Sequence, residues 1–194
     1  MQIEIKLSDK YLEYYKDHNK MPLPEYATSG SAAVDLVALK DYVIYPGEVV
    51  EINTGVSIWI GSDEARAGGC ESLSLPKTSP TGWVSDELIS IAAHIIPRSG
   101  RGAKEGLVIA NTIGLIDEDY QGELIVYVYN RNLLYYQIED DTNAYVDDEV
   151  INIKGGERFA QLYFLPIIKP TFKIVEKFSS STERGEGGFH STGD

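Results

Sequence analysis

The chain has 194 residues, of which 43% are hydrophobic and 24% charged, and this composition suits one globular domain with a sizeable core. Its 30 acidic and 17 basic side chains give a formal net charge of −13, so direct binding to nucleic acids is not expected. The single cysteine, Cys70, excludes an internal disulfide bond. No signal-peptide core and no apolar run of membrane-spanning length is present, so we expect a cytoplasmic protein without membrane contact.

Most of the sequence alternates between apolar and polar residues, as β-strands do. Ile3 and Ile5 alternate with polar residues, and residues 42–60 contain two such runs separated by the turn pair Pro46 and Gly47. Further strands are predicted at runs of β-branched and aromatic residues, namely 123–130, 158–164 and 171–178. Many short strands separated by turns predict an all-β sandwich or barrel.

Three segments depart from this β pattern. Residues 9–18 are predicted to form a helix with Ser8 as its N-cap. Residues 61–90 are too long for an ordinary loop, and loops of this length are usually functional or disordered. Residues 132–150 are interpreted as a hairpin with its turn near 140–143, and their acidic side chains favour a solvated face over a metal site.

The tail carries an unexpected combination of residues. Residues 184–189 read RGEGGF, with one arginine and one aromatic residue at fixed distances from three glycines. A disordered terminus needs no aromatic residue, whereas a phosphate-binding segment needs glycine for close backbone approach and a cation.

Four other stretches contain polar residues at strand ends or turns. They are SGSAAVDL (29–36), IIPRSG (95–100), NTIGLIDEDYQGEL (111–124), which is interpreted as a hairpin, and GGERFAQLYF (155–164). Each stretch alone has an ordinary structural explanation, such as a capped turn or a surface charge. Together they supply arginines, glycines and carboxylates, which is an inventory for a polyphosphate and a divalent ion.

In this order the stretches resemble the five motifs of the homotrimeric dUTPases, the dUTP nucleotidohydrolases. The motifs here read SGSAAVDL, PRSG, NTIGLIDEDYQGEL, GERFAQ and RGEGGF. The resemblance implies a jelly-roll-like β-barrel of the β-clip type, assembled as a homotrimer with shared active sites. Residues 1–178 then form the barrel domain, with insertions at 61–90 and 132–150, and residues 179–194 form a flexible arm that carries the lid motif.

The resemblance also implies roles for individual residues. Asp117 is expected to be the general base that orients a water for attack on the α-phosphorus, and to hold the deoxyribose 3′-hydroxyl. Tyr120 is expected to lie under the sugar and to exclude a 2′-hydroxyl. Uracil is expected to be recognised by Asn111 and by the hairpin backbone around Leu115, Ile116 and Ile125.

The remaining residues are expected to hold the triphosphate. Asp35 is placed near Mg²⁺, through water, and Arg158 is placed as a structural partner for acids such as Asp35. The residues expected to hold phosphate oxygens are Arg98, Ser99, Gly100 and Gln161. The lid is expected to contribute Arg184, Gly187, Phe189, Ser191 and Thr192. His190 stands where the family often has glycine, and its side chain is expected to affect lid closure.

The implied activity is hydrolysis of dUTP to dUMP and pyrophosphate. One alternative is dCTP deaminase, which shares the fold but has a catalytic glutamate after the strand start, whereas no acid follows Glu123 in LIVYVYN. A second alternative is a regulatory module that binds a protein partner through the insertions, as in some phage members of the family. This second alternative is compatible with enzymatic activity.

Overall fold

The computed structural model describes residues 3–18, 24–61, 90–133 and 149–187, and this part of the chain consists mainly of β-strands. The strands are β1 (Glu4–Leu7), β2 (Val34–Val37), β3 (Tyr42–Ile44), β4 (Val49–Trp59), β5 (Ser90–Pro97), β6 (Leu107–Ile109), β7 (Gly114–Ile116), β8 (Glu123–Asn130), β9 (Ile151–Ile153) and β10 (Arg158–Ile167). The helices are α1 (Asp9–His18) and α3 (Ser99–Lys104).

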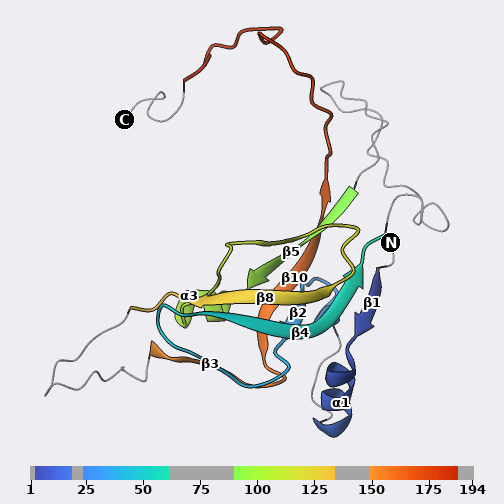
Figure 1. The fold of residues 1–194 in the computed structure, drawn as a ribbon, viewed down its shortest axis with the longest axis vertical. Coiled ribbons are helices and arrows are strands. Elements are labelled where there is room, and N and C mark those ends of the chain that lie inside the picture. The colour runs from blue at the N-terminus through green and yellow to red at the C-terminus, as the bar shows by residue number, and fades with distance from the viewer. Residues whose placement is uncertain (1–2, 19–23, 62–89, 134–148, 188–194) are drawn as a thin grey trace, which may run out of the picture.

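The strands form two four-stranded sheets, ordered β1-β4-β8-β6 and β2-β10-β5-β7, and a two-stranded sheet of β3 and β9. All of these pairs are antiparallel. Strands that follow one another in the sequence often lie in different sheets, so the chain crosses repeatedly between layers, as Figure 1 shows. This arrangement confirms the predicted all-β, jelly-roll-like fold.

The inward faces of the sheets form one hydrophobic core. In β8, Leu124, Val126 and Val128 are buried, whereas Ile125 and Tyr127 between them are exposed. This follows from the two-residue period of a strand, which sends alternate side chains to opposite faces. The alternation that predicts strand 123–130 therefore also decides which of its residues can contact a ligand or another chain.

Helix α1 confirms the prediction for residues 9–18. Ser8 Oγ accepts a hydrogen bond from the Tyr11 backbone N–H at 3.2 Å, which satisfies one of the donors left unpaired at a helix start. The Tyr11 side chain is only 1% exposed and packs into the core, so it anchors the helix to the sheets.

The turn between β3 and β4 forms where Pro46 and Gly47 predict it. The Glu48 N–H donates to the Tyr45 carbonyl at 3.0 Å, and Gly47 has a φ of 77°, a left-handed conformation that favours glycine.

Strand β10 is longer than predicted, because it continues through Pro166 to Ile167. Pro166 pairs with Ile91 of β5, but the pairing of β10 with β2 on its other side ends at Leu162. Beyond Leu162 one side of β10 has no partner strand among the described residues, so a proline can be accommodated there.

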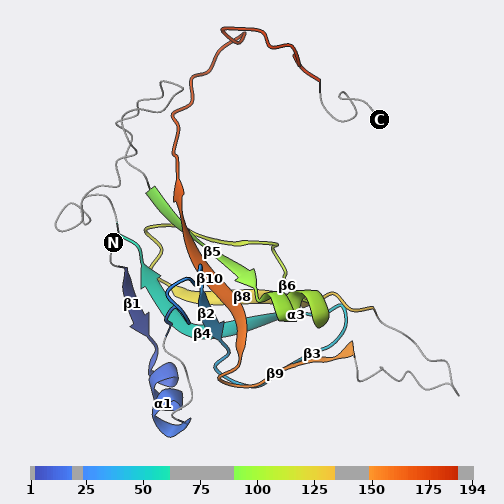
Figure 2. The ribbon, with the colours of Figure 1, turned by 180° about the vertical axis from the view of Figure 1, so that it is seen from behind.

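The predicted strand at 171–178 is wrong. These residues form no regular structure, and Phe172, Ile174 and Phe178 are 92%, 99% and 90% exposed. Figures 1 and 2 both show the segment after β10 leading away from the sheets. A strand forms only beside another strand, and none of the described residues provides one here. We name residues 168–187 the C-terminal arm.

The insertions at 61–90 and 132–150 lie almost entirely outside the described residues, so their predicted hairpin and loop are not described. In the described parts of the chain, no helix is both long enough and apolar enough to cross a membrane.

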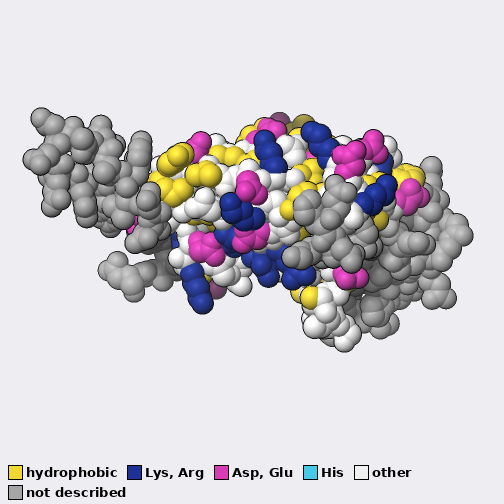
Figure 3. Space-filling model, turned by 90° about the horizontal axis from the view of Figure 1, so that it is seen from below, with side chains coloured by type: hydrophobic (Ala, Val, Ile, Leu, Met, Phe, Trp, Pro, Cys, Tyr) yellow, Lys and Arg dark blue, Asp and Glu magenta, His cyan; other side chains and the backbone are white. Residues whose placement is uncertain are grey.

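Acidic and basic side chains are interspersed on the face shown in Figure 3. One exposed pair joins Lys154 Nζ to Asp41 Oδ2 at 3.0 Å, and the Gly155 N–H donates to Asp41 Oδ1 at 2.9 Å. The hydrogen bond from Gly155, followed by that from Lys154, lowers the pKa of Asp41 below its usual value.

Candidate active site

Asp35 of β2 lies at the centre of a polar cluster at one edge of a four-stranded sheet. Its Oδ1 lies 3.0 Å from Arg98 Nε and 3.2 Å from Gln161 Nε2, and its Oδ2 lies 3.5 Å from Arg158 Nε. The Asp35 side chain is 17% exposed, whereas those of Arg98 and Arg158 are 38% and 46% exposed. The carboxylate thus orients two guanidinium groups whose outer sides remain open to solvent. We name these four residues the β2-edge cluster.

Strand pairing explains how β10 contributes to this cluster. Gln161 lies directly opposite Asp35 in the β2–β10 ladder, so the two side chains share a face. Arg158 precedes an irregularity in register, and Phe159 and Ala160 are both buried, which strict alternation does not allow. A bulge of this kind re-aims side chains, and here it allows Arg158 to reach the face that carries Asp35.

Arg98 enters the cluster because a strand changes into a helix at this point. β5 ends at Pro97, and Arg98 has an extended conformation, with φ −66° and ψ 139°, immediately before α3. Ser99 and Gly100 are exposed in the first turn, where backbone N–H groups have no partner within a helix. A side chain at Gly100 would meet no atom within 4 Å, so the space beside it is open.

Asp117 and Tyr120 lie on the turn between β7 and β8. The Tyr120 N–H donates to the Asp117 carbonyl at 3.2 Å, and Tyr120 Oη donates to the Glu123 carbonyl at 2.9 Å. A Cβ atom at Gly122 would lie 2.4 Å from Tyr120 Oη, so glycine at this position permits the observed placement of the phenol ring. Both Asp117 and Tyr120 are exposed.

The interpretation of residues 111–124 as a hairpin is wrong. β7 pairs with β5 in one sheet, and β8 pairs with β4 and β6 in the other. The segment therefore crosses between sheets. Gly114 and Gly122, which suggest turn or bulge positions, allow close approach of Ile95 and Tyr120 respectively.

The residues expected to recognise uracil are distributed over this crossing. Asn111 is exposed in the turn before β7, where Thr112 has a φ of 67°. Leu115 and Ile125 are 61% and 41% exposed, on β7 and β8 respectively, while Ile116 packs partly against the core. Exposed apolar side chains on both strands are available to contact a planar base.

The described lid residues contact neither the β2-edge cluster nor the turn that carries Asp117 and Tyr120. Arg184 Nε donates to the Gly187 carbonyl at 2.9 Å, and Gly187 N–H donates back to the Arg184 carbonyl at 3.0 Å, so both belong to a tight turn within the C-terminal arm. Phe189, His190, Ser191 and Thr192 lie outside the described residues.

Asp35 and Asp117, the two carboxylates of the predicted site, lie at opposite edges of one sheet. In the order β2-β10-β5-β7, Asp35 is on one edge strand and Asp117 directly follows the other. Three strand spacings of about 4.8 Å put such edges roughly 14 Å apart across the sheet. One chain alone therefore does not bring Asp117 beside the β2-edge cluster.

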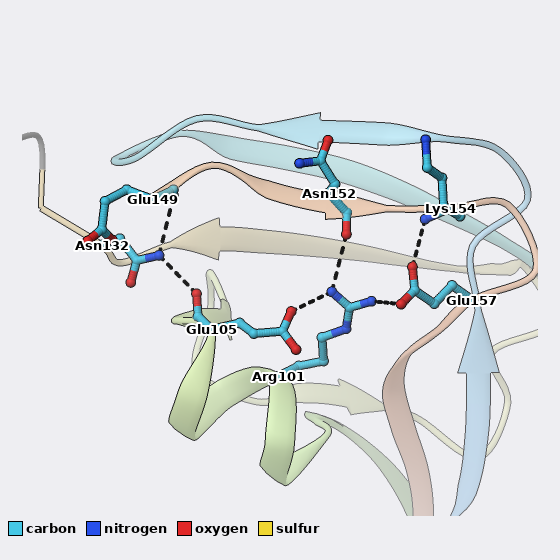
Figure 4. Close-up of polar contacts among 7 residues, drawn as sticks. All are labelled: Arg101, Glu105, Asn132, Glu149, Asn152, Lys154 and Glu157. Atoms are coloured by element: carbon cyan, nitrogen blue, oxygen red, sulfur yellow. Dashed lines mark hydrogen bonds and ion pairs between the residues drawn. The ribbon is translucent and has the colours of Figure 1, made fainter. Parts of the chain in front are cut away.

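Two residues near these groups are not predicted from the sequence. Arg101 of α3 is 8% exposed and contacts two glutamates (Figure 4). Glu118, beside Asp117, contacts Lys169 at the base of the C-terminal arm and accepts a 3.4 Å hydrogen bond from Ser90. Their position next to PRSG and Asp117 is the only sequence signal, since burial and partners depend on the fold.

Asp35 is the carboxylate expected near Mg²⁺. Among the described residues, no group of three or more His, Cys, Asp or Glu side chains could hold a metal ion. Mg²⁺ usually keeps several waters and binds one or two carboxylates together with substrate phosphates. The β2-edge cluster fits an ion that is held mainly by a polyphosphate and contacted by Asp35 through water.

Comparisons with known proteins give a consistent result. A family model described as dUTPase matches residues 76–141 and 144–193. A deoxyuridine 5′-triphosphate nucleotidohydrolase of Tolumonas auensis is 41% identical over 194 residues, covering 99% of this chain and 97% of the relative. A protein of the same name from Haemophilus influenzae is 39% identical with the same coverage.

Solved structures agree with these relatives. The dUTPase of Staphylococcus bacteriophage 80alpha, determined with dUPNHPP, matches with a TM-score of 0.68 and 25% identity, covering 100% of this chain and 99% of that one. The dUTPase of phage phi11 of S. aureus matches with a TM-score of 0.62 and 22% identity, covering 93% and 99%. The matched family model, the relatives and the fold together show that this chain belongs to the dUTPase family.

Proposed function

We propose that the chain hydrolyses dUTP to dUMP and pyrophosphate, which limits uracil incorporation into DNA and supplies dUMP for dTMP synthesis. The observation that carries this proposal is the near full-length identity to relatives named deoxyuridine 5′-triphosphate nucleotidohydrolase. The β2-edge cluster supports it, because guanidinium groups held by a carboxylate are suited to binding phosphate oxygens.

Asp117 acts as the general base in this proposal. It orients a water for in-line attack on the α-phosphorus and accepts a hydrogen bond from the deoxyribose 3′-hydroxyl. A carboxylate that also holds the sugar has a fixed position relative to the reacting phosphorus. The turn that carries Asp117 is held by the hydrogen bond from Tyr120 N–H to its carbonyl.

Tyr120 selects deoxyribose over ribose. Its phenol donates a hydrogen bond to the Glu123 carbonyl and lies close to Gly122, which supports a fixed position for the ring. In this proposal the ring lies under the sugar and leaves no room for a 2′-hydroxyl. The groups that select uracil are Asn111 and the backbone around Leu115, Ile116 and Ile125. Cytosine reverses the donor and acceptor pattern of uracil, so it leaves buried polar groups unpaired.

Arg98, Ser99, Gly100 and Gln161 hold phosphate oxygens. Arg158 keeps Asp35 in place, and Asp35 is the carboxylate that would hold Mg²⁺ through a water ligand. When bound, Mg²⁺ neutralises triphosphate charge and orients the phosphate chain for attack. From the lid, Arg184 reaches the γ-phosphate, Phe189 covers uracil, and Gly187, Ser191 and Thr192 close over the substrate and exclude water.

The active form is a homotrimer with shared sites. Support comes from the separation of Asp117 and the β2-edge cluster across one sheet, because a second copy can present its β7 edge to the first copy's β2 edge. The exposed Phe172, Ile174 and Phe178 give further support, because such side chains on a C-terminal arm suit burial against another subunit.

A protein partner that binds through the insertions is a second proposed function, and it does not exclude the first. It is supported by the similarity to phage 80alpha dUTPase, which is described among phage dUTPases that control transfer of virulence genes. A pull-down with and without residues 132–150 tests it, and identical partners for both forms would contradict it.

Pyrophosphate release from dUTP, dCTP, dTTP and UTP, each with Mg²⁺ and with EDTA, tests the proposed reaction. We expect release from dUTP alone and its loss on chelation. Ammonia release from dCTP would instead assign the chain to dCTP deaminase. Release from UTP at the same rate as from dUTP would contradict the role of Tyr120.

A further inference from the structure

A buried arginine lies directly beside the proposed phosphate-binding segment. Arg101 is 8% exposed, and its guanidinium contacts acceptors from three places in the fold. Nη1 donates to Glu105 Oε2 at 2.6 Å and to the Asn152 carbonyl at 3.2 Å, while Nη2 donates to Glu157 Oε1 (Figure 4). The planar fork of arginine suits such simultaneous contacts, and lysine cannot reproduce them.

One side of this contact set belongs to the segment that follows PRSG. Arg101 lies three residues after Arg98, and the Gly102 N–H donates to the Arg98 carbonyl at 2.8 Å. Glu105 is the residue that caps the C-terminal end of α3, so its pair with Arg101 stays local to this helix. A displacement of Arg101 would therefore move the backbone of Ser99 and Gly100 with it.

The other side belongs to the turn before β10. Glu157 immediately precedes Arg158, and its second carboxylate oxygen accepts the Lys154 N–H at 2.8 Å. The turn is also tied to the end of β2, since Ala38 N–H donates to the Glu157 carbonyl at 3.0 Å and Gly156 N–H to the Ala38 carbonyl at 2.7 Å. These hydrogen bonds hold Glu157 in place relative to the sheet that carries the β2-edge cluster.

These contacts close a ring. Arg101 contacts Glu157, the chain continues to Arg158, Arg158 and Arg98 both contact Asp35, and α3 connects Arg98 back to Arg101. The ring constrains the separation between two arginines whose outer sides are open to solvent.

We propose that Arg101 is a positioning residue, which sets the spacing of the Arg98–Gly100 segment relative to Arg158 and thereby the affinity for a triphosphate. This inference rests on the proposed function. It differs from a purely structural role, because it predicts weaker binding of the phosphates without weaker binding of the nucleoside.

The test compares inhibition constants for two probes, a non-hydrolysable imido analogue of dUTP and deoxyuridine, which has no phosphate. Arg101→Met retains much of the side-chain volume without the charge. We expect Arg101→Met to raise the inhibition constant of the analogue roughly tenfold or more, since misplacement of an interacting group by about 1 Å can cost up to 10²-fold. Deoxyuridine inhibition is expected to stay within about twofold, and Arg101→Lys is expected to be intermediate.

Arg131→Met is the matched control. Arg131 is exposed and donates to the Gly102 carbonyl at 2.9 Å, so it touches the same helix without linking it to Glu157. We expect this variant to keep the wild-type ratio of the two inhibition constants. If Arg101→Met raises the inhibition constants of both probes by the same factor, the inference is overturned. It is also overturned if neither inhibition constant changes.

A second pair of variants covers the case in which Arg101→Met does not fold. Glu157→Gln keeps a carbonyl acceptor but removes the charge of the contact between α3 and the sheet, whereas Glu105→Gln changes only the contact between α3 and its own C-cap residue. We expect a larger loss of analogue affinity for Glu157→Gln, and equal effects would overturn the inference.

Wild-type turnover of dUTP is measured in parallel. Absence of turnover would overturn the proposed function and this inference. Normal turnover, with the ratio of the two inhibition constants unchanged in the variants, would overturn only the inference.

Discussion

The two edges of the β2-β10-β5-β7 sheet differ in how completely they are formed. At the β2 edge, Asp35 is 17% exposed and holds Arg98, Arg158 and Gln161 through contacts within one chain. At the β7 edge, Leu115 and Tyr120 are 61% and 42% exposed. The comparison teaches that the proposed phosphate-binding groups are positioned within one chain by strand pairing and by the end of β5, whereas the proposed base-and-sugar side is open and suited to a second surface.

The largest effect is expected from Asp117→Asn at the β7 edge. Loss of the general base should lower kcat by roughly 10²–10⁴-fold, while affinity for the imido analogue of dUTP stays near wild type. Turnover and analogue binding are measured together, with the exposed Asp41→Asn as a control for loss of a carboxylate elsewhere. Near-normal kcat for Asp117→Asn would contradict the assignment of the base.

The second largest effect is expected from deleting the lid, which belongs to neither edge of the sheet. Deleting residues 180–194 removes Arg184 and the lid, and loss of a donor to developing charge typically costs about 10²–10³-fold in kcat. The deletion should leave the oligomer intact, because the strands end at Ile167. Steady-state kinetics and sedimentation measure both quantities, and dissociation to monomers would mean that this segment is structural.

A smaller effect is expected from Gly122→Ala. The added Cβ would lie 2.4 Å from Tyr120 Oη, so the phenol must move from its place at the β7 edge. The preference for dUTP over UTP in kcat/KM should fall by about tenfold, the scale of one misplaced methyl group in a pocket. Tyr120→Ala should act in the same direction, and an unchanged preference in both variants would exclude Tyr120 as the sugar selector.

The smallest effect is expected from Glu118→Gln. This change weakens the contact between Glu118, whose side chain is 19% exposed, and Lys169, whose side chain is 57% exposed, and ion pairs near the surface contribute about 0.2–1 kcal/mol. A small fall in Tm is expected in a thermal unfolding measurement, with kcat close to wild type. A large loss of kcat would mean that Glu118 positions the Asp117 turn and is not merely a surface contact.

Much of the fold could be predicted from local patterns. Alternation at 123–130 gives the strand and its buried face, and Ser8 correctly marks the start of the helix at residues 9–18. The same reasoning fails at 171–178, because β-branched and aromatic residues indicate a strand only where a partner strand exists. It also fails at 111–124, where two strands close in sequence pair in different sheets.

The candidate site could be predicted only as a set of residues. The motifs contain Asp35, Arg98, Arg158 and Gln161, and the register of β2 and β10, together with the end of β5, brings them together. The separation of Asp117 from this cluster depends on the order of strands in the sheet, which no short motif encodes. The burial of Arg101 likewise depends on contacts with residues more than 50 positions away.

Subunit complementation tests most directly whether the two edges meet between chains. Asp117→Asn and Arg98→Ala each remove one edge's function, so each variant alone is expected to be nearly inactive. If sites are shared, trimers assembled from equal amounts of the two variant chains should have about one quarter of their sites intact. Half of the β7 edges and half of the β2 edges are then intact, and each working site needs one of each. Activity that stays at the sum of the two single variants, in mixtures shown to contain both chains, would contradict the shared site.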